Sequence, residues 1–393
     1  AQDYWAKVKT GDIGPLAAIL GLVVLCIVFG SMSPVFLTQG NFANLLTQAA
    51  AVIVIAMGLV FVLLIGEIDL SAGYASGVCS AVLVILVTKN DQPWYLALTA
   101  SIIVGCVLGY LIGILVARLG IPSFVVTLAS FLAFQGILLL LAGEGGTIRI
   151  EDKTVLAIEN SNLSVSASWL FFIVVSAIYF LSGLARINSR RKAGLKTELK
   201  KLWLIKTLAL IGASGLAVLT LNLERSNNPD LVSLKGIPYV VPLILAILVV
   251  GTFVLDRTAF GRHIYAVGGN AEAARRAGIN VKRIRIACFM ICSGLSAIAG
   301  LIFASRQNSV SPTTGGSSTL LYAVGAAVIG GTSLFGGKGK MRDAILGGLV
   351  VAVIDNGMGL LGYAAGIKFI VTGLVLLTSA SVDAISRRGV ANS

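Results

Sequence analysis

The stretch FGRHIYAVGGNAEAARRAGINVKRIRI, from Phe260 to Ile286, is a polar and strongly basic island between two long apolar runs. The chain around it is 57% hydrophobic and only 12% charged, whereas soluble domains average about 25% charged residues. An apolar run of about 20 residues can cross the hydrocarbon core of a bilayer as a helix. Such runs recur along the whole chain, so the predicted fold class is an all-α, polytopic membrane protein.

The apolar runs predict about twelve transmembrane helices. A β-barrel is not expected, because its strands would alternate apolar and polar residues over roughly 10 positions. The expected spans are 15–33, 45–66, 70–88, 95–117, 122–142, 166–186, 203–222, 237–256, 285–305, 320–337, 343–362 and 367–385.

Basic residues indicate the orientation, because cytoplasmic loops carry an excess of Lys and Arg. With both termini inside, most of the 30 Lys and Arg residues fall in cytoplasmic segments, and the largest clusters are Arg186–Lys206 and Arg257–Arg285. The net charge of +13 is therefore interpreted as membrane topology, and nucleic acid is not an expected partner. The N-terminal AQDYWAKVKTGDIG lacks the pattern of a removable signal peptide, so the first run is expected to be a retained span.

The chain, 1–393, is predicted to form a single transmembrane domain with three special segments. The loop 143–165 lies outside, and its composition fits a small structured element as well as a solvated connector. The segment 166–222 is a helix pair joined by a basic cytoplasmic loop, interpreted as a topology anchor. The segment 257–285 is the charged island itself.

Signs of catalytic chemistry are missing from the sequence. The five cysteines fall inside apolar runs, and the single histidine, His263, has no partner set nearby. Residues 330–340 read GGTSLFGGKGK, in which the lysine register and the missing hydroxyl residue depart from the phosphate-loop pattern. We therefore expect no enzyme activity, no metal site and no nucleotide or other cofactor bound by this chain.

The stretch LLIGEIDLSAG, from Leu63 to Gly73, places Glu67 and Asp69 between two spans with almost no loop. A carboxylate at the bilayer centre costs roughly 2.5–3.5 kcal/mol. These groups either line a water-filled path on a broken helix, or Asp69 with Ser71 caps the start of the next span.

Polar residues inside the other spans are expected to face the bundle interior, where they bind substrate or hold helices together. The glycines of GCVLGYLIG, from Gly105 to Gly113, recur every four residues and predict a close-packed helix face, within the bundle or in a dimer. The candidate substrate-path residues are Glu67, Asp69, Ser71, Gln135, Asp355 and Asn356.

Within the charged island, Asn270 is a favourable N-cap for a short helix. Glu272 near its start and Arg275 near its end complement the helix dipole, and Gly278 is a typical stop. Such a helix is marginal alone. It is either a solvated surface helix or a rigid element that docks into a cytoplasmic partner.

AFGRHIYAVGGNAEAARRAGINVKRIRI (259–286) resembles the cytoplasmic coupling segment of permeases from ATP-driven monosaccharide importers, the ribose, galactose and xylose group. GLVFVLLIGEIDLSAG, IPSFVVTLASFLAFQGI, VIGGTSLFGGKG and IDNGMGLLG resemble further parts of that family in the same order. The resemblance covers most of the chain outside 143–236.

The resemblance implies a permease fold with two copies of this chain forming the pore in a prokaryotic cytoplasmic (inner) membrane. A separate ABC ATPase subunit would use ATP and Mg, and an extracytoplasmic binding protein would deliver the sugar. The 270–278 helix would transmit the motion of the ATPase. By resemblance, the ATPase-coupling contact falls on Gly268, Gly269, Asn270, Glu272, Ala274, Arg275, Gly278 and Asn280.

Two departures from the ribose-type pattern favour the xylose branch. LLYA (Leu320 to Ala323) stands where many ribose-type members carry the acidic ELDA, and the pair 166–222 is additional. Xylose is therefore the favoured substrate, with other pentoses and hexoses as alternatives. Two further readings stay open: an ion-coupled secondary transporter that uses Glu67 and Asp69, and a membrane scaffold or receptor.

Overall fold

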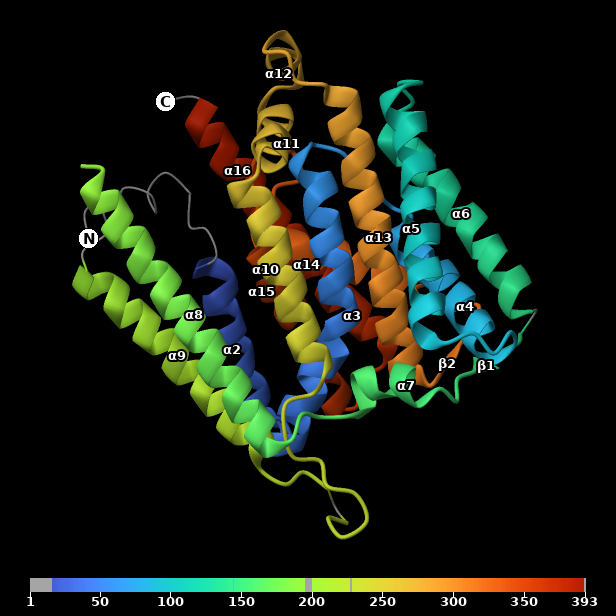
Figure 1. Cartoon of the computed structure of the whole chain (residues 1–393), viewed down its shortest axis with the longest axis vertical. Coiled ribbons are helices and arrows are strands. Elements are labelled where there is room, and N and C mark those ends of the chain that lie inside the picture. The colour runs from blue at the N-terminus through green and yellow to red at the C-terminus, as the bar shows by residue number, and fades with distance from the viewer. Residues whose placement is uncertain (1–15, 144, 195–199, 227, 392–393) are drawn as a thin grey trace. The chain divides into compact units, whose positions relative to one another are not determined.

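The computed structural model describes residues 16–143, 145–194, 200–226 and 228–391, and helices dominate them (Figure 1). The N-terminal segment up to residue 15, with its basic residues, and Glu144 and Lys196 lie outside these ranges. The helices are α2 (Leu16–Met32), α3 (Gln39–Leu64), α4 (Ala72–Thr88), α5 (Trp94–Ala117), α6 (Ser123–Ala142), α7 (Lys153–Asn160), α8 (Val165–Lys192), α9 (Lys200–Asn222), α10 (Val240–Arg257), α11 (Ala259–Gly269), α12 (Ala271–Arg276), α13 (Val281–Gln307), α14 (Ser317–Ile329), α15 (Met341–Leu360) and α16 (Ala365–Ala391).

The described residues contain 8 helices that are long and apolar enough to cross a membrane, together with four shorter apolar helices. Each expected span overlaps one of these helices, while the count of twelve spans and their orientation stay predictions. The span expected at 320–337 is shorter, because α14 ends at Ile329. Gly331, Gly336 and Gly337 then adopt φ values of +118°, +83° and +74°, which turn the chain out of the helix.

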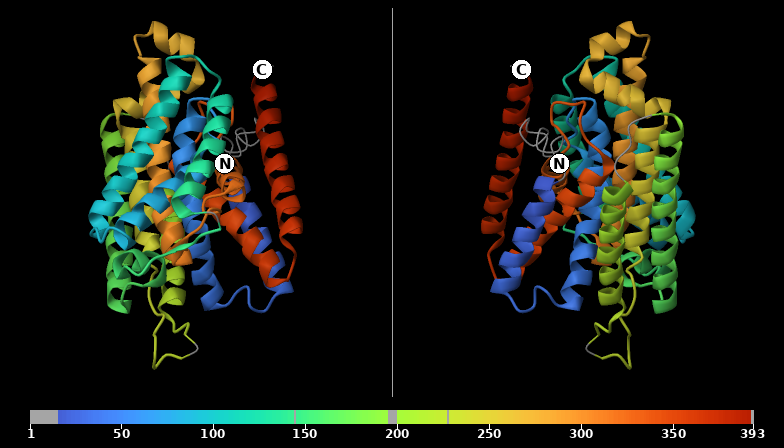
Figure 2. Two further views of the ribbon diagram at one scale, coloured as in Figure 1. Left: turned by 90° about the vertical axis from the view of Figure 1, so that its right-hand side faces the viewer. Right: turned by 90° about the vertical axis from the view of Figure 1, so that its left-hand side faces the viewer.

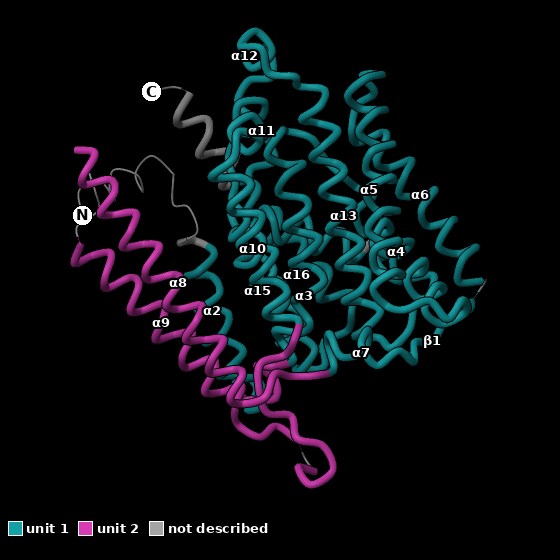
Figure 3. The backbone as a smooth tube through the Cα atoms, viewed as in Figure 1, with its two compact units in different colours: residues 1–37, 44–160, 240–393 teal, residues 38–43, 161–239 magenta. Residues whose placement is uncertain are grey.

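Two compact units divide the described chain (Figure 3). Unit 2 comprises residues 38–43 and 161–239 and holds α8 and α9, which pack side by side with Phe180 against Trp203. The segments that enter and leave this unit are joined by backbone hydrogen bonds. Leu163 N donates to Ile237 O over 2.8 Å, and Tyr239 N donates to Ser161 O over 3.1 Å. Because the ends of the pair meet, it can be inserted without breaking the path of the remaining chain.

Unit 1 comprises the described parts of 1–37, 44–160 and 240–393. From Ala49 to Leu64, α3 is almost entirely buried, and α13 packs against α4 and α5. The glycine stripe of α5 lies in this last contact. A Cβ at Gly105 would come within 2.5 Å of Ser293 O, and one at Gly113 within 2.7 Å of Ile286 Cα. The stripe is therefore a close-packing face within the bundle.

The two ends of α13 carry different structures. At its N-terminal end, α11 and α12 form a projecting segment, which both side views keep at one end of unit 1 (Figures 1 and 2). At its C-terminal end, α7 packs against α13, and β1 (Ile148–Arg149) pairs antiparallel with β2 (Ser309–Val310). The segment 143–165 thus contains a strand and a short helix.

Candidate functional site

The charged island forms two helices joined at Asn270. Thr258 Oγ1 accepts a hydrogen bond from Gly261 N at 3.1 Å and caps α11. Asn270 Oδ1 accepts from Ala273 N at 2.9 Å and caps α12, while Gly278 has φ +84° after its end. The short helix with an Asn270 cap is therefore confirmed. The sequence reading missed α11, although Ile264 and Val267, both buried, stand at helical spacing.

The outer surface of α12 is charged and internally paired. Glu272 Oε1 lies 2.9 Å from Arg275 Nη2 and 3.2 Å from Arg276 Nε. Hydrogen bonds from these two arginines lower the pKa of Glu272. An acidic residue in the first turn and basic residues in the last also complement the helix dipole. The segment therefore presents a preformed charged helix.

Most of the residues expected to contact an ATPase are exposed, namely Gly269, Asn270, Glu272, Arg275, Gly278 and Asn280. Ala274 points the other way: it is 4% exposed and belongs to the core of unit 1. A six-residue helix has too few bonds to persist alone, so one face must pack. Ala274 therefore anchors α12, and the partner-accessible face is the opposite one.

Gly268 lies where α11 meets the rest of unit 1. A Cβ there would collide with Leu64 O at the end of α3, and would lie 2.7 Å from Gly337 N. Gly337 N itself donates to Leu64 O over 2.8 Å. Three backbones thus meet without intervening side chains. We call the contact of Leu64, Gly268 and Gly337 the glycine junction.

The loop 330–340 is a structural connection beneath α11. Tyr265 of α11 donates its hydroxyl hydrogen to Gly339 O over 2.8 Å. Burial raises the pKa of Tyr265 to about 12, so the donor keeps its proton at neutral pH. The glycines of this loop permit close backbone contact, which gives them a structural role.

The α3–α4 connection lies at the same end. Glu67 Oε1 pairs with Arg285 Nε of α13 at 3.1 Å. Asp69 Oδ1 accepts from Ser71 N at 2.8 Å and from Ser71 Oγ at 2.6 Å, a local turn just before α4. Ser71 is the N-cap of α4 but makes no side-chain capping bond, so the expected cap on the helix N–H groups is not formed. Ile68 N donates to Ser123 Oγ over 3.3 Å, so the connection also holds the start of α6.

The remaining path residues do not gather with these. Gln135 is exposed on α6 and does not face the bundle interior as expected, because the buried face of that helix is formed by Phe134 and Leu138. Asp355 of α15 lies 3.6 Å from Lys368. Asn356 is 6% exposed, and its Nδ2 donates to Gln48 Oε1 over 3.3 Å. The six candidates therefore occupy three separate places, namely the α3–α4 connection, α6 and the C-terminal part of α15.

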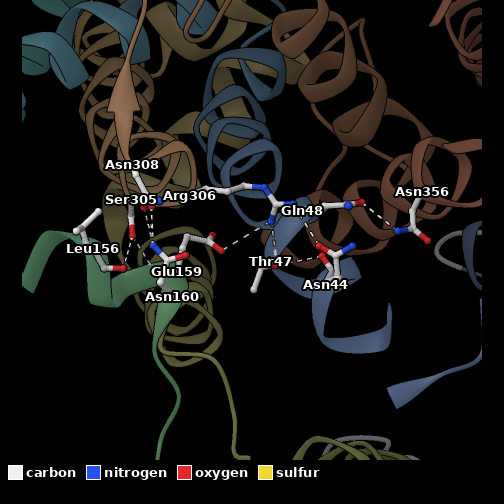
Figure 4. Close-up of polar contacts among 10 residues, drawn as sticks. All are labelled: Asn44, Thr47, Gln48, Leu156, Glu159, Asn160, Ser305, Arg306, Asn308 and Asn356. Carbon is white, nitrogen blue, oxygen red and sulfur yellow. Dashed lines mark hydrogen bonds and ion pairs between the residues drawn. The ribbon is translucent and has the colours of Figure 1, made fainter. Parts of the chain in front are cut away.

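A polar cluster that the sequence analysis missed surrounds Asn356, near the C-terminal ends of α13 and α15 (Figure 4). Arg306 Nη1 donates to Thr47 Oγ1 over 2.9 Å, and Nη2 donates to Asn44 Oδ1 over 3.3 Å. The sequence contained a sign of this cluster, because the polar residues Asn44, Thr47 and Gln48 stand three and one positions apart on the first turns of α3. We call Asn44, Thr47, Gln48, Arg306 and Asn356 the polar cluster.

Beside this cluster, hydrogen bonds fasten α7 to the end of α13 (Figure 4). Ser305 Oγ donates to Leu156 O and accepts from Glu159 N, both at 3.0 Å. Asn160 Nδ2 donates to Ser305 O and Asn308 Oδ1, both at 2.9 Å.

Across the described ranges, no group of three His, Cys, Asp or Glu side chains could hold a metal ion.

The amino-acid sequence of the chain is similar to those of known transport proteins. The family model described as "Branched-chain amino acid transport system / permease component" matches residues 41–380. The xylose transport system permease protein XylH of Escherichia coli K12 is 37% identical over 90% of this chain and 87% of its own length. That of Haemophilus influenzae is 32% identical over 97% and 99%.

The ribose import permease protein RbsC of Haemophilus influenzae is 28% identical over 93% of this chain and 92% of its own length. No solved structure matches the chain.

Proposed function

Because the chain belongs to the family of branched-chain amino acid transport system permease components, we propose that it is the membrane-spanning subunit of an ATP-driven monosaccharide importer. It works as a pair of identical subunits in a prokaryotic inner membrane, with a separate ATPase that uses ATP and Mg and with an extracytoplasmic binding protein. The relatives named for xylose and ribose transport match along nearly the whole chain, which supports a sugar over a branched-chain amino acid.

Xylose is the favoured sugar. The relatives named for xylose are 32–37% identical, against 28% for the ribose relative from Haemophilus influenzae. The helix pair in unit 2 and the LLYA stretch favour the same branch.

The observation that carries the mechanism is the docking of α11 on the glycine junction. In the proposed function, the exposed side of α12 contacts the ATPase, and its buried side is continuous with Ala274 and Gly268. A push on α12 then acts on the end of α3 at Leu64 and on the loop after α14 at Gly337, because backbone packed directly on backbone leaves no side chain to absorb it. These elements lead into the bundle.

Coupling to an ion gradient has less support. Glu67 is paired with Arg285, and Asp69 Oδ1 is hydrogen-bonded to Ser71, so each side chain has a structural partner for one oxygen. The family is also one of transport-system permease components, which are not described as ion-coupled carriers.

The test is sugar uptake into proteoliposomes that contain this chain, its ATPase and its binding protein. Labelled xylose should accumulate only when ATP and both partners are present, and competing sugars should rank by their inhibition. Uptake by the chain alone under a proton or sodium gradient would contradict the proposal. Uptake of leucine or valine in place of sugar would leave the importer but overturn its substrate class.

A further inference from the structure

We propose that the polar cluster of Asn44, Thr47, Gln48, Arg306 and Asn356 is the first station for a neutral sugar inside the permease, where sugar hydroxyls replace hydrogen bonds between helices. The inference rests on the proposed function, and it assigns a binding place that the coupling mechanism leaves open.

The position of the cluster fits an entrance. It joins α3, α13 and α15 near the C-terminal end of α13, whereas the α11–α12 segment precedes the N-terminal end of the same helix (Figures 1 and 4). With α12 in the cytoplasm, the cluster faces the side from which the binding protein delivers sugar. Beyond Ala49, α3 becomes an almost continuous buried apolar helix, so these are its last polar groups on that side before the buried part begins.

The exposure of the side chains distinguishes a binding place from a buried polar contact. Asn44 is exposed, and Thr47, Gln48 and Arg306 are partly exposed, while Asn356 is 6% exposed. Groups that only hold helices together in a membrane interior are normally enclosed by their neighbours. Here four of the five are at least partly exposed and can be reached by a ligand, while Asn356 is buried.

The chemistry of the cluster matches a neutral polyol. The three amides and the threonine hydroxyl both donate and accept hydrogen bonds, as sugar hydroxyls do. Arg306 is the single cation of the cluster, and Glu159 Oε2 lies 4.0 Å from its Nη1. The Glu159 side chain is 1% exposed, and burial raises its pKa to about 8, so the carboxyl binds Arg306 only weakly at neutral pH. The N–H donors of Arg306 therefore stay available to sugar hydroxyl oxygens.

Two of the hydrogen bonds within the cluster are long, while a third, from Arg306 Nη1 to Thr47 Oγ1, measures 2.9 Å. The Gln48–Asn356 and Arg306–Asn44 contacts both measure 3.3 Å, at the weak end for hydrogen bonds between nitrogen and oxygen. Exchanging these two bonds for contacts with sugar hydroxyls therefore changes the free energy only slightly. The station is therefore weak and releasable, which suits a transport path.

A direct test is sugar protection of a thiol at position 44 in the assembled permease–ATPase complex. Asn44→Cys is made in a background with Cys26→Ala and Cys106→Ala, because these two native cysteines are only half-buried. Gln307→Cys, exposed beside the cluster, is the matched control. Xylose should slow modification at position 44 by about threefold or more and leave position 307 unchanged, since an occupied site shields its lining.

A functional test uses Gln48→Met, which keeps the length of the side chain and removes its hydrogen bonds. Asn160→Leu is the control, because it breaks two bonds of α7 and touches no member of the cluster. Gln48→Met should lower xylose uptake at limiting sugar-loaded binding protein by about fivefold, roughly one hydrogen bond. Asn160→Leu should leave the dependence of uptake on sugar unchanged.

The outcomes separate the two proposals. If the wild-type complex imports xylose but neither protection at position 44 nor an effect of Gln48→Met is seen, the station is overturned and the importer stands. If xylonate, the anionic acid, protects better than xylose, the cluster is an anion site built on Arg306 and the neutral-sugar assignment is wrong. If the wild-type complex imports no sugar, the proposed function fails and the station fails with it.

Discussion

Glu67 Oε1 lies 3.1 Å from Arg285 Nε, and this ion pair joins the α3–α4 connection to the second turn of α13. Both side chains are mostly withdrawn from solvent, so the pair fixes two elements next to the coupling segment. Glu67→Gln should lower the stability of the purified chain by about 1–3 kcal/mol, because it leaves the guanidinium without its carboxylate.

The charge-swapped variant, Glu67→Arg with Arg285→Glu, should recover part of that loss in thermal unfolding measured in detergent. A single Glu67→Gln substitution with wild-type stability but no uptake would show that Glu67 acts in transport itself, which this account does not expect.

Gly268→Val should uncouple ATP hydrolysis from uptake. Its side chain would collide with Leu64 O and force the glycine junction apart. Gly269→Ala is the matched control, because a Cβ there meets nothing within 4 Å. The measurement is the ratio of sugar imported to ATP hydrolysed, with thermal unfolding to confirm that both variants fold. Equal ratios in both folded variants would mean that the glycine junction does not transmit the motion.

The glycine stripe of α5 should tolerate no larger residue. A Cβ at Gly109 would lie 2.7 Å from Met290 Cα, so Gly109→Val should destabilise the chain by on the order of 1–3 kcal/mol. Gly136→Ala on the open side of α6, where a Cβ meets nothing within 4 Å, should have little effect. The measurement is the thermal stability of both variants against the wild type. Equal destabilisation by the two substitutions would argue against the packing described.

Glu159 should make stability depend on pH. Its folded-state pKa of about 8 lies above the ordinary carboxyl value because burial outweighs the attraction of Arg306. A raised pKa means that the folded chain holds the proton more tightly than the unfolded chain. This contribution is therefore complete below about pH 4.5 and is lost as the pH rises towards about 8.

Glu159→Gln should flatten the fall in melting temperature between pH 5 and pH 8. A variant that melts with the same pH dependence as the wild type would show that Glu159 is not the responsible group.

The sequence predicted what depends on neighbouring residues. The Asn270 cap and the Gly278 stop follow local hydrogen-bonding rules, and the structure contains both. Asp69 and Ser71 also bond to each other, but they do not cap α4. Apolar runs of sufficient length likewise gave helices, because backbone groups in hydrocarbon must be satisfied internally.

What the sequence could not provide depends on the packing of distant segments. Gln135 stands inside an apolar run, yet only the packing of α6 decides that it is exposed. Ala274 stands beside charged residues, yet it is the buried anchor of α12. The polar cluster joins residues roughly 260 to 310 positions apart in the chain, and no local pattern pairs Gln48 with Asn356.

If the exposed face of α12 receives the motion of a separate ATPase, inverting the charges on that face should block transport. In the variant with Glu272→Arg and Arg275→Glu, the pair three residues apart can re-form, and the Asn270 cap and the Ala274 anchor are untouched. The charges presented to the partner are reversed. The measurement is ATP-driven xylose uptake into proteoliposomes with the ATPase and binding protein. We expect a folded, membrane-inserted variant with uptake lowered by at least about tenfold; uptake equal to that of the wild type would contradict the account.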